Sequence, residues 1–236
     1  MMLTPDLQRP PLSRVVAWRE VGLAVVVLWS VLGGACFFLG AQSIYDRWGT
    51  SLNATLVLDV VFLIGCLAVI GFVFWRQRRQ GEGIVELGWG RPVRMPVIVI
   101  AVVYGLAWTT MSYMRGGDPL AFPWQRPIMM AIGLVLAFAE EIAVRGLILD
   151  RLARCGTSRI IQIVVTAGIM AVYHGVVGHS VWPSYMVSSF VLFGVLSVIY
   201  VYGGRSLTPV YIAHAMAHFL GDPALMQGVL YGVGAG

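Results

Sequence analysis

The chain has 236 residues, of which 58% are hydrophobic and only 11% are charged, and its formal net charge is +5. A soluble globular protein carries about 25% charged residues, so this composition excludes an ordinary soluble domain. Every basic residue is arginine, and the arginines flank apolar runs instead of forming one face. This arrangement argues against nucleic-acid binding and is typical of a membrane protein.

Seven apolar stretches approach or exceed the roughly 17–25 residues that a helix needs to cross a bilayer. In chain order they are Val21–Gly40, Ala54–Trp75, Pro96–Tyr113, Pro127–Leu149, Ile160–Val177, Tyr185–Tyr202 and Leu207–Leu220. The last has only 14 residues, and the apolar segment 221–236 would be an eighth, short helix. The sequence therefore predicts an all-α polytopic membrane bundle. We expect residues 1–82 to form a cytoplasmic segment and two helices, 83–220 the functional core, and 221–236 an apolar tail.

The arginines are unequally divided between the two ends of these helices. Twelve lie in the N-terminal segment and in the second, fourth and sixth loops, whereas only Arg47, Arg115 and Arg126 lie in the opposite loops. Because cytoplasmic loops are enriched in basic residues, we expect a cytoplasmic N-terminus. The first twenty residues lack the apolar region and cleavage site of a signal peptide, which predicts a retained first helix. Basicity from arginine alone is typical of a high-GC bacterial genome, so we expect an inner-membrane protein.

The fourth predicted helix contains three ionisable residues, Glu140, Glu141 and Arg145. Such residues are costly inside a bilayer and usually face a cavity or a partner. Glu141 and Arg145 are four residues apart and can pair along one helix face. Glu140 points about 100° away from Glu141 and has no partner in its own helix. The plain alternative is that all three only hold neighbouring helices together.

Three of the four histidines lie inside predicted helices, and the fourth, His179, is expected in a loop. His174 is in the fifth helix, and His214 and His218 share one face of the seventh because they are four residues apart. That spacing also suits two ligands of one zinc ion. With a rise of about 1.5 Å per residue, Glu140 and the three histidines lie at similar depths. The sequence therefore predicts one polar chamber inside the membrane.

Taken in chain order, these residues resemble the CPBP family, the CAAX-protease and bacteriocin-processing (Abi) group of intramembrane proteases. The motifs that carry the resemblance are Glu140-Glu141-x-x-x-Arg145, His174 and His214-x-x-x-His218. The loop at residues 83–88 and the stretch from Phe190 to Leu220, with its "SLTP" segment, extend the resemblance over roughly residues 83–220.

This resemblance implies an intramembrane endopeptidase. Glu140 would be the general base and His174 would help to hold a water molecule, while His214 and His218 would stabilise the oxyanion. The role implied for Glu141 and Arg145 is to position the helix. The scheme requires no cofactor; the implied partners are the lipid bilayer and a membrane-associated or lipidated protein or peptide substrate, not nucleic acid.

Two positions depart from the family pattern. Met170 replaces the usual aromatic residue four positions before His174, and His218 replaces the usual asparagine. Because histidine also binds metal, a zinc metalloprotease with His174, His214 and His218 as ligands and Glu140 as base stays open. A proton-coupled carrier that uses a Glu/His relay, and a non-catalytic membrane scaffold, are the alternatives from other functional classes.

Overall fold

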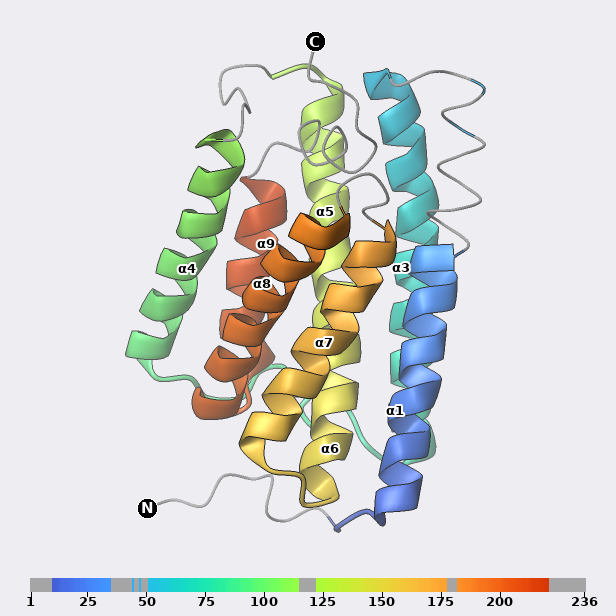
Figure 1. Ribbon diagram of the computed structural model, residues 1–236, viewed down its shortest axis with the longest axis vertical. Helices are drawn as coiled ribbons and strands as arrows, with labels where there is room; N and C mark the ends of the chain where they lie inside the picture. Colours follow the sequence, from blue (N-terminus) through green and yellow to red (C-terminus); the bar gives the residue numbers. More distant parts are fainter. Residues whose placement is uncertain are drawn as a thin grey trace.

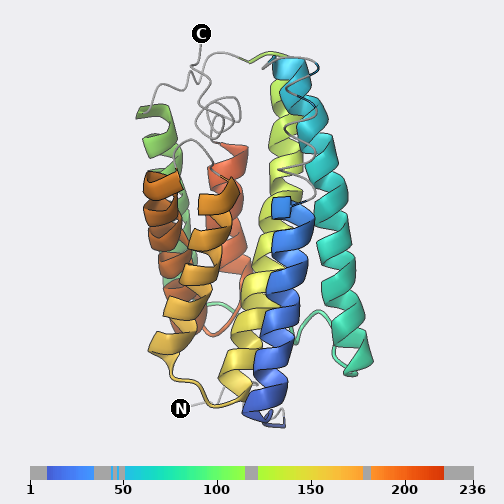
Figure 2. The ribbon, with the colours of Figure 1, turned by 45° about the vertical axis from the view of Figure 1, so that its right-hand side comes forward.

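The helices of the computed structural model run roughly along one long axis (Figures 1 and 2). The structure describes residues 10–34, 51–114, 122–177 and 182–220, together with residues 44 and 47. In chain order the helices are α1 (Arg14–Leu28), α3 (Leu52–Arg79), α4 (Met95–Met114), α5 (Gln125–Glu141), the π-helical segment η3 (Ile142–Leu149), α6 (Asp150–Arg154), α7 (Arg159–Val177), α8 (Trp182–Tyr202) and α9 (Leu207–Phe219).

All seven predicted helices are present, because α5, η3 and α6 form one continuous helix. Helices long and apolar enough to cross a membrane are Arg14–Gly34, Leu52–Arg79, Gln125–Arg154 and Pro183–Tyr202, and two shorter apolar helices lie at Met95–Met111 and Arg159–Gly175. The residues that the structure describes contain no strand. These features confirm the predicted helical membrane bundle. The segment 221–236, predicted as an eighth helix, lies outside the described residues.

The first helix begins at Arg14, seven residues before the predicted start at Val21. The Ser13 hydroxyl caps it by accepting a hydrogen bond from the backbone N–H of Val16 (3.3 Å). Glu20 is buried and forms an ion pair with Arg76 of α3. Hydropathy alone placed the start too late, because the cap and this ion pair make the polar first turns compatible with a helix.

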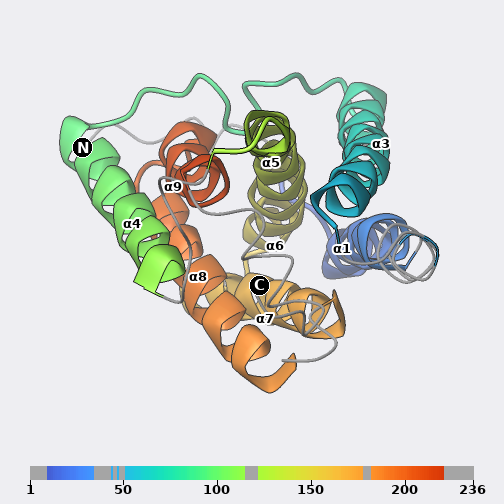
Figure 3. The same cartoon turned by 90° about the horizontal axis from the view of Figure 1, so that it is seen from above.

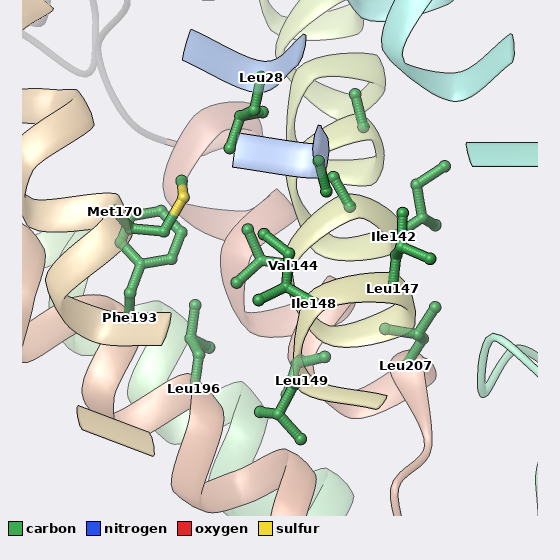
Figure 4. Close-up of a cluster of buried hydrophobic side chains, with 14 of the residues drawn as sticks. Leu28, Ile142, Val144, Leu147, Ile148, Leu149, Met170, Phe193, Leu196 and Leu207 are labelled. Atoms are coloured by element: carbon green, nitrogen blue, oxygen red, sulfur yellow. The ribbon is translucent and has the colours of Figure 1, made fainter. Parts of the chain in front are cut away.

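The bundle is organised around α5, which packs between α3 and α9 (Figure 3). On the far side of α9 lies α4, while α7 and α8 pack closely against each other. The continuation of α5, η3, contacts both α1 and α7. Its side chains Val144 and Ile148 join Met170, Phe193 and Leu196 in one buried hydrophobic cluster (Figure 4). The part of the helix that follows the two glutamates, η3 and α6, is therefore enclosed by neighbouring helices.

The segment between α3 and α4, the second of the loops in which the sequence places arginines, packs into the bundle. Leu87 is fully buried, and a side chain at Gly146 of η3 would meet it. The Trp89 ring lies edge-on to the rings of Phe138 in α5 (5.3 Å) and Tyr211 in α9 (5.4 Å). The loop thus contacts two of the helices that carry motif residues, α5 and α9.

The arginine-rich helix ends lie together at one end of the bundle. Arg154, at the end of α6, pairs with Glu82 after α3 (2.6 Å) and accepts a backbone hydrogen bond from Leu12 (3.1 Å). At the same end, Arg205 after α8 donates to the side chain of Gln162 in α7 (2.7 Å). Arginines that the sequence assigns to the cytoplasmic loops therefore lie at one end of the bundle, as expected if successive helices cross the membrane in alternating directions.

Candidate active site

The first motif lies where the long central helix changes its hydrogen-bonding pattern. Glu140 and Glu141 are the last two residues of α5, and Arg145 follows in the π-helical segment η3. Short π-helical segments within α-helices frequently occur at functional sites. All three side chains are buried, with 2%, 0% and 0% of their surface exposed. Glu141 and Arg145 pair with each other, and the neighbouring helices α9 and α8 supply one further partner for each.

The Glu141 carboxylate accepts hydrogen bonds from two side chains, Arg145 and His214. Arg145 Nη1 donates to its Oε1 at 3.0 Å, and His214 Nδ1 of α9 lies 2.8 Å from the same oxygen. A carboxylate only accepts hydrogen bonds, so Nδ1 of His214 carries the hydrogen. This bond fixes the His214 ring and leaves its Nε2 facing the opposite way. The glutamate therefore orients an imidazole, much as a carboxylate does in a hydrolase triad.

Glu140 has a different environment from its neighbour. Its Oε2 is buried and has no hydrogen-bond partner among the residues described, and it lies 3.8 Å from His214 Nε2. Burying a carboxylate oxygen without a partner is costly, and functional sites are where such groups are tolerated. Oε2 of Glu141 is also buried without a partner, but Oε1 of Glu141 accepts from both Arg145 and His214. Glu140 has no such hydrogen bond among the described residues, so it is the carboxylate that is freer to bind a water molecule or a substrate.

The two histidines of α9 face each other across one turn of the helix. Their Nε2 atoms are 3.2 Å apart and their ring centroids 5.0 Å apart, so one hydrogen lies between the two nitrogens. His214 is almost fully buried, and His218 is partly exposed. Both rings are on the side of α9 that faces α5. A side chain at Gly133 of α5 would collide with His218, which shows how closely the two helices approach.

His174 enters the site from α7. Its Nδ1 is 2.8 Å from the carbonyl oxygen of Met170, one turn earlier, and must donate because a carbonyl only accepts. Its Nε2 is thereby left as an acceptor. The ring contacts those of Tyr173 (4.8 Å), Tyr185 (5.5 Å) and Phe193 (5.0 Å). The sequence-predicted residues thus converge from α5, η3, α7 and α9.

Phe193 of α8 is a member of this cluster that the sequence does not indicate. Its ring lies 5.0 Å from that of His174 and 5.2 Å from that of His214, and the Arg145 guanidinium lies 5.0 Å from its centroid. Its carbonyl oxygen accepts a hydrogen bond from Arg145 Nη2 (2.8 Å). It is one of many apolar residues in α8, so no sequence signal distinguishes it.

Among the described residues, no group of three or more His, Cys, Asp and Glu side chains is arranged to hold a metal ion. The pair His214 and His218 presents two nitrogens 3.2 Å apart. Two nitrogen ligands of one tetrahedral zinc ion, each at about 2.0–2.1 Å, would be separated by roughly the same distance. His174 would have to supply the third ligand through its Nε2 atom. The zinc hypothesis therefore stays a prediction for metal analysis.

Comparison with known proteins relates one segment of the chain to a family. Residues 122–220 match the family model described as type II CAAX prenyl endopeptidase Rce1-like. This segment contains the six residues of the three motifs, and the match confirms the resemblance to CPBP intramembrane proteases over residues 122–220 of the predicted 83–220. No curated protein and no solved structure matches the chain.

Proposed function

We propose that this integral membrane protein, whose residues 122–220 match type II CAAX prenyl endopeptidases, hydrolyses a peptide bond by means of a water molecule that Glu140 activates. The family match supports an intramembrane endopeptidase at the family level, acting on a protein substrate within a lipid bilayer. The observation that carries the proposed mechanism is the buried Glu140 carboxylate oxygen, which has no hydrogen-bond partner among the described residues and faces His214.

In this mechanism Glu140 removes a proton from a water molecule held with the help of His174 Nε2. The water oxygen then attacks the scissile carbonyl carbon, and the carbonyl electrons move to its oxygen to form an oxyanion. When the carbon–nitrogen bond breaks, Glu140 returns the proton to the leaving amine. Removal of such a general base lowers a rate about 10²–10⁴-fold.

His214 and His218 would stabilise the oxyanion. Because Glu141 occupies the Nδ1 hydrogen of His214, His214 can donate to the oxyanion only through a protonated Nε2, whose hydrogen would then point at the oxyanion instead of at Nε2 of His218. The imidazolium is then stabilised by Glu141, whose own charge is balanced by Arg145. Donors of this kind are worth about 3–4 kcal/mol when they point at the developing charge. Glu141 and Arg145 are therefore positioning residues in this proposal.

The proposed orientation has the arginine-rich end of the bundle in the cytoplasm of a bacterial cell, with the protein in the inner membrane. The site is enclosed by helices, so the substrate would be a membrane-associated or lipidated protein or peptide that reaches it from the bilayer. The candidate substrates are a prenylated C-terminus, a leader peptide, a bacteriocin precursor and a sorting segment.

The proposal is tested with the purified protein in lipid vesicles, supplied with a farnesylated CAAX peptide, its unprenylated form and a leader peptide attached to a transmembrane helix. We expect mass spectrometry to reveal one new cleavage site in at least one of these peptides, and none with vesicles from a mock purification. Proton uptake by the vesicles without any cleavage would support the carrier instead. Cleavage that zinc chelation abolishes and added zinc restores would support the metalloprotease.

A further inference from the structure

Phe193 contacts the rings of two of the proposed catalytic histidines, His174 and His214. Its ring is tilted by 38° to the ring of His174 and is perpendicular (90°) to the ring of His214, with centroid distances of 5.0 and 5.2 Å. The first ring comes from α7 and the second from α9, and Phe193 itself comes from α8. Three separate helices thus meet through a single aromatic side chain.

The position of Phe193 is fixed by its backbone as well as by its ring. Its carbonyl oxygen accepts hydrogen bonds from Arg145 Nη2 and from the hydroxyl of Ser197, both at 2.8 Å. The Ser197 hydroxyl lies 3.0 Å from the Thr166 hydroxyl of α7. All four residues are buried. Hydrogen bonds therefore hold α8 to both η3 and α7 and fix the backbone position from which the Phe193 ring projects.

The ring also meets the positively charged group that balances Glu141. The Arg145 guanidinium carbon lies 5.0 Å from the Phe193 centroid, within the distance at which a cation is attracted to an aromatic face. The same guanidinium donates to Glu141, and Glu141 accepts from His214. Phe193 thus contacts His214 directly and also contacts the cation that holds the partner of His214.

We propose that Phe193 is a positioning residue whose ring sets the separation and the tilt of the His174 and His214 rings. This inference rests on the proposed function, in which His174 holds the water and His214 stabilises the oxyanion. An aliphatic side chain of similar volume would fill the space but would lose the edge-to-face contact and the attraction to Arg145. The two imidazoles would then shift relative to each other, and a misplacement of about 1 Å can lower a rate 10²-fold.

The chain offers a matched control in the same helix. Phe190 lies one turn before Phe193, is 42% exposed on the outside of the bundle, and has the same side chain. Phe193→Leu and Phe193→Met both remove the ring while keeping most of the volume, so one can serve if the other fails to fold. Phe190→Leu and Phe190→Met make the same chemical changes away from the site.

The experiment compares these four variants with wild type in lipid vesicles, using the peptide that wild type cleaves. For the Phe193 variants we expect kcat to fall about 10–100-fold with KM changed less than threefold. The pH profile of kcat should also change, while the melting temperature should stay close to that of the Phe190 variants. If both Phe193 variants retain kcat and the pH profile of wild type, or lose activity only in proportion to folded protein, Phe193 is a packing residue and the proposal is wrong.

A second readout does not depend on catalysis. In nanodiscs, the imidazole ¹⁵N chemical shifts of His174 and His214 should change in Phe193→Leu and remain those of wild type in Phe190→Leu. Changed shifts in a protein that cleaves no peptide would preserve the structural inference and contradict only the proposed function. Unchanged shifts in both variants would overturn the inference itself.

Discussion

Replacing Gly133 by alanine should impair the site through the position of His218, although Gly133 carries no chemistry. Gly133 is two turns before Glu140 on α5, and a Cβ at this position would lie 2.8 Å from the Cβ of His218. The atom it meets is the first carbon of the side chain, so no rotation of His218 about its side-chain bonds relieves the collision. The backbones of α5 and α9 must separate.

The size of that separation follows from the geometry. Ordinary van der Waals contact begins at 3.4 Å, so the helices must part locally by at least 0.6 Å. A displacement of about 1 Å at a reacting group can lower a rate 10²-fold, so we expect kcat to fall about 10–100-fold. Alanine stabilises a helix relative to glycine by about 0.5–1 kcal/mol, so the loss of activity should not come with a general loss of helix.

The matched control is Gly168→Ala in α7, where an added Cβ would have no neighbour within 4 Å. Both variants and wild type are assayed for peptide cleavage in vesicles, and their folded fractions are measured by thermal unfolding. Gly168→Ala should keep its activity within about twofold of wild type, in line with a surface change of small effect. If Gly133→Ala is as active as Gly168→Ala, the close approach of α5 and α9 does not position His218 and the reasoning is refuted.

Three further predictions concern the ion pair, the metal and the orientation. Arg145→Met leaves Glu141 buried without its cation and should lower the free energy of unfolding by about 3–5 kcal/mol. The double variant Arg145→Met/Glu141→Leu should recover folding but not activity. Equal melting temperatures for Arg145→Met and wild type would contradict this prediction. His218→Asn should retain substantial activity without bound metal, and an inactive variant depleted of zinc by elemental analysis would favour the metalloprotease. In a background without native cysteines, Arg94→Cys should resist an impermeant maleimide on intact cells and Phe122→Cys should react, and the reverse pattern would invert the topology.

The helices could be predicted from the sequence because apolar length decides them. In a bilayer every backbone polar group must be satisfied within the helix, so a long apolar run leaves little choice of structure. The helix Gln125–Arg154 shows this directly, since it stays continuous through Glu140, Glu141 and Arg145 and through a change to π-helical hydrogen bonding. The loop at residues 80–94 shows the opposite. Its Leu87 and Trp89 pack inside the bundle, but a short segment without periodicity carries no signal for such packing.

Within the site, local contacts could be foreseen and contacts between helices could not. The pair of Glu141 and Arg145 follows from helix spacing, and it forms. The bond between Glu141 and His214 depends on how far α5 and α9 are rotated about their own axes, which spacing within one helix does not determine. Phe193 is harder still to find, because α8 is apolar on all its faces and its sequence does not show which face meets the histidines.

The most direct test of the account is the rate of peptide cleavage by Glu140→Gln in the vesicles used for wild type. Glutamine keeps the size of the side chain and removes only the charge and the ability to take a proton. We expect kcat to fall about 10²–10⁴-fold, with membrane insertion and melting temperature close to those of wild type. A Glu140→Gln protein that keeps more than about a tenth of the wild-type rate would show that Glu140 is not the general base.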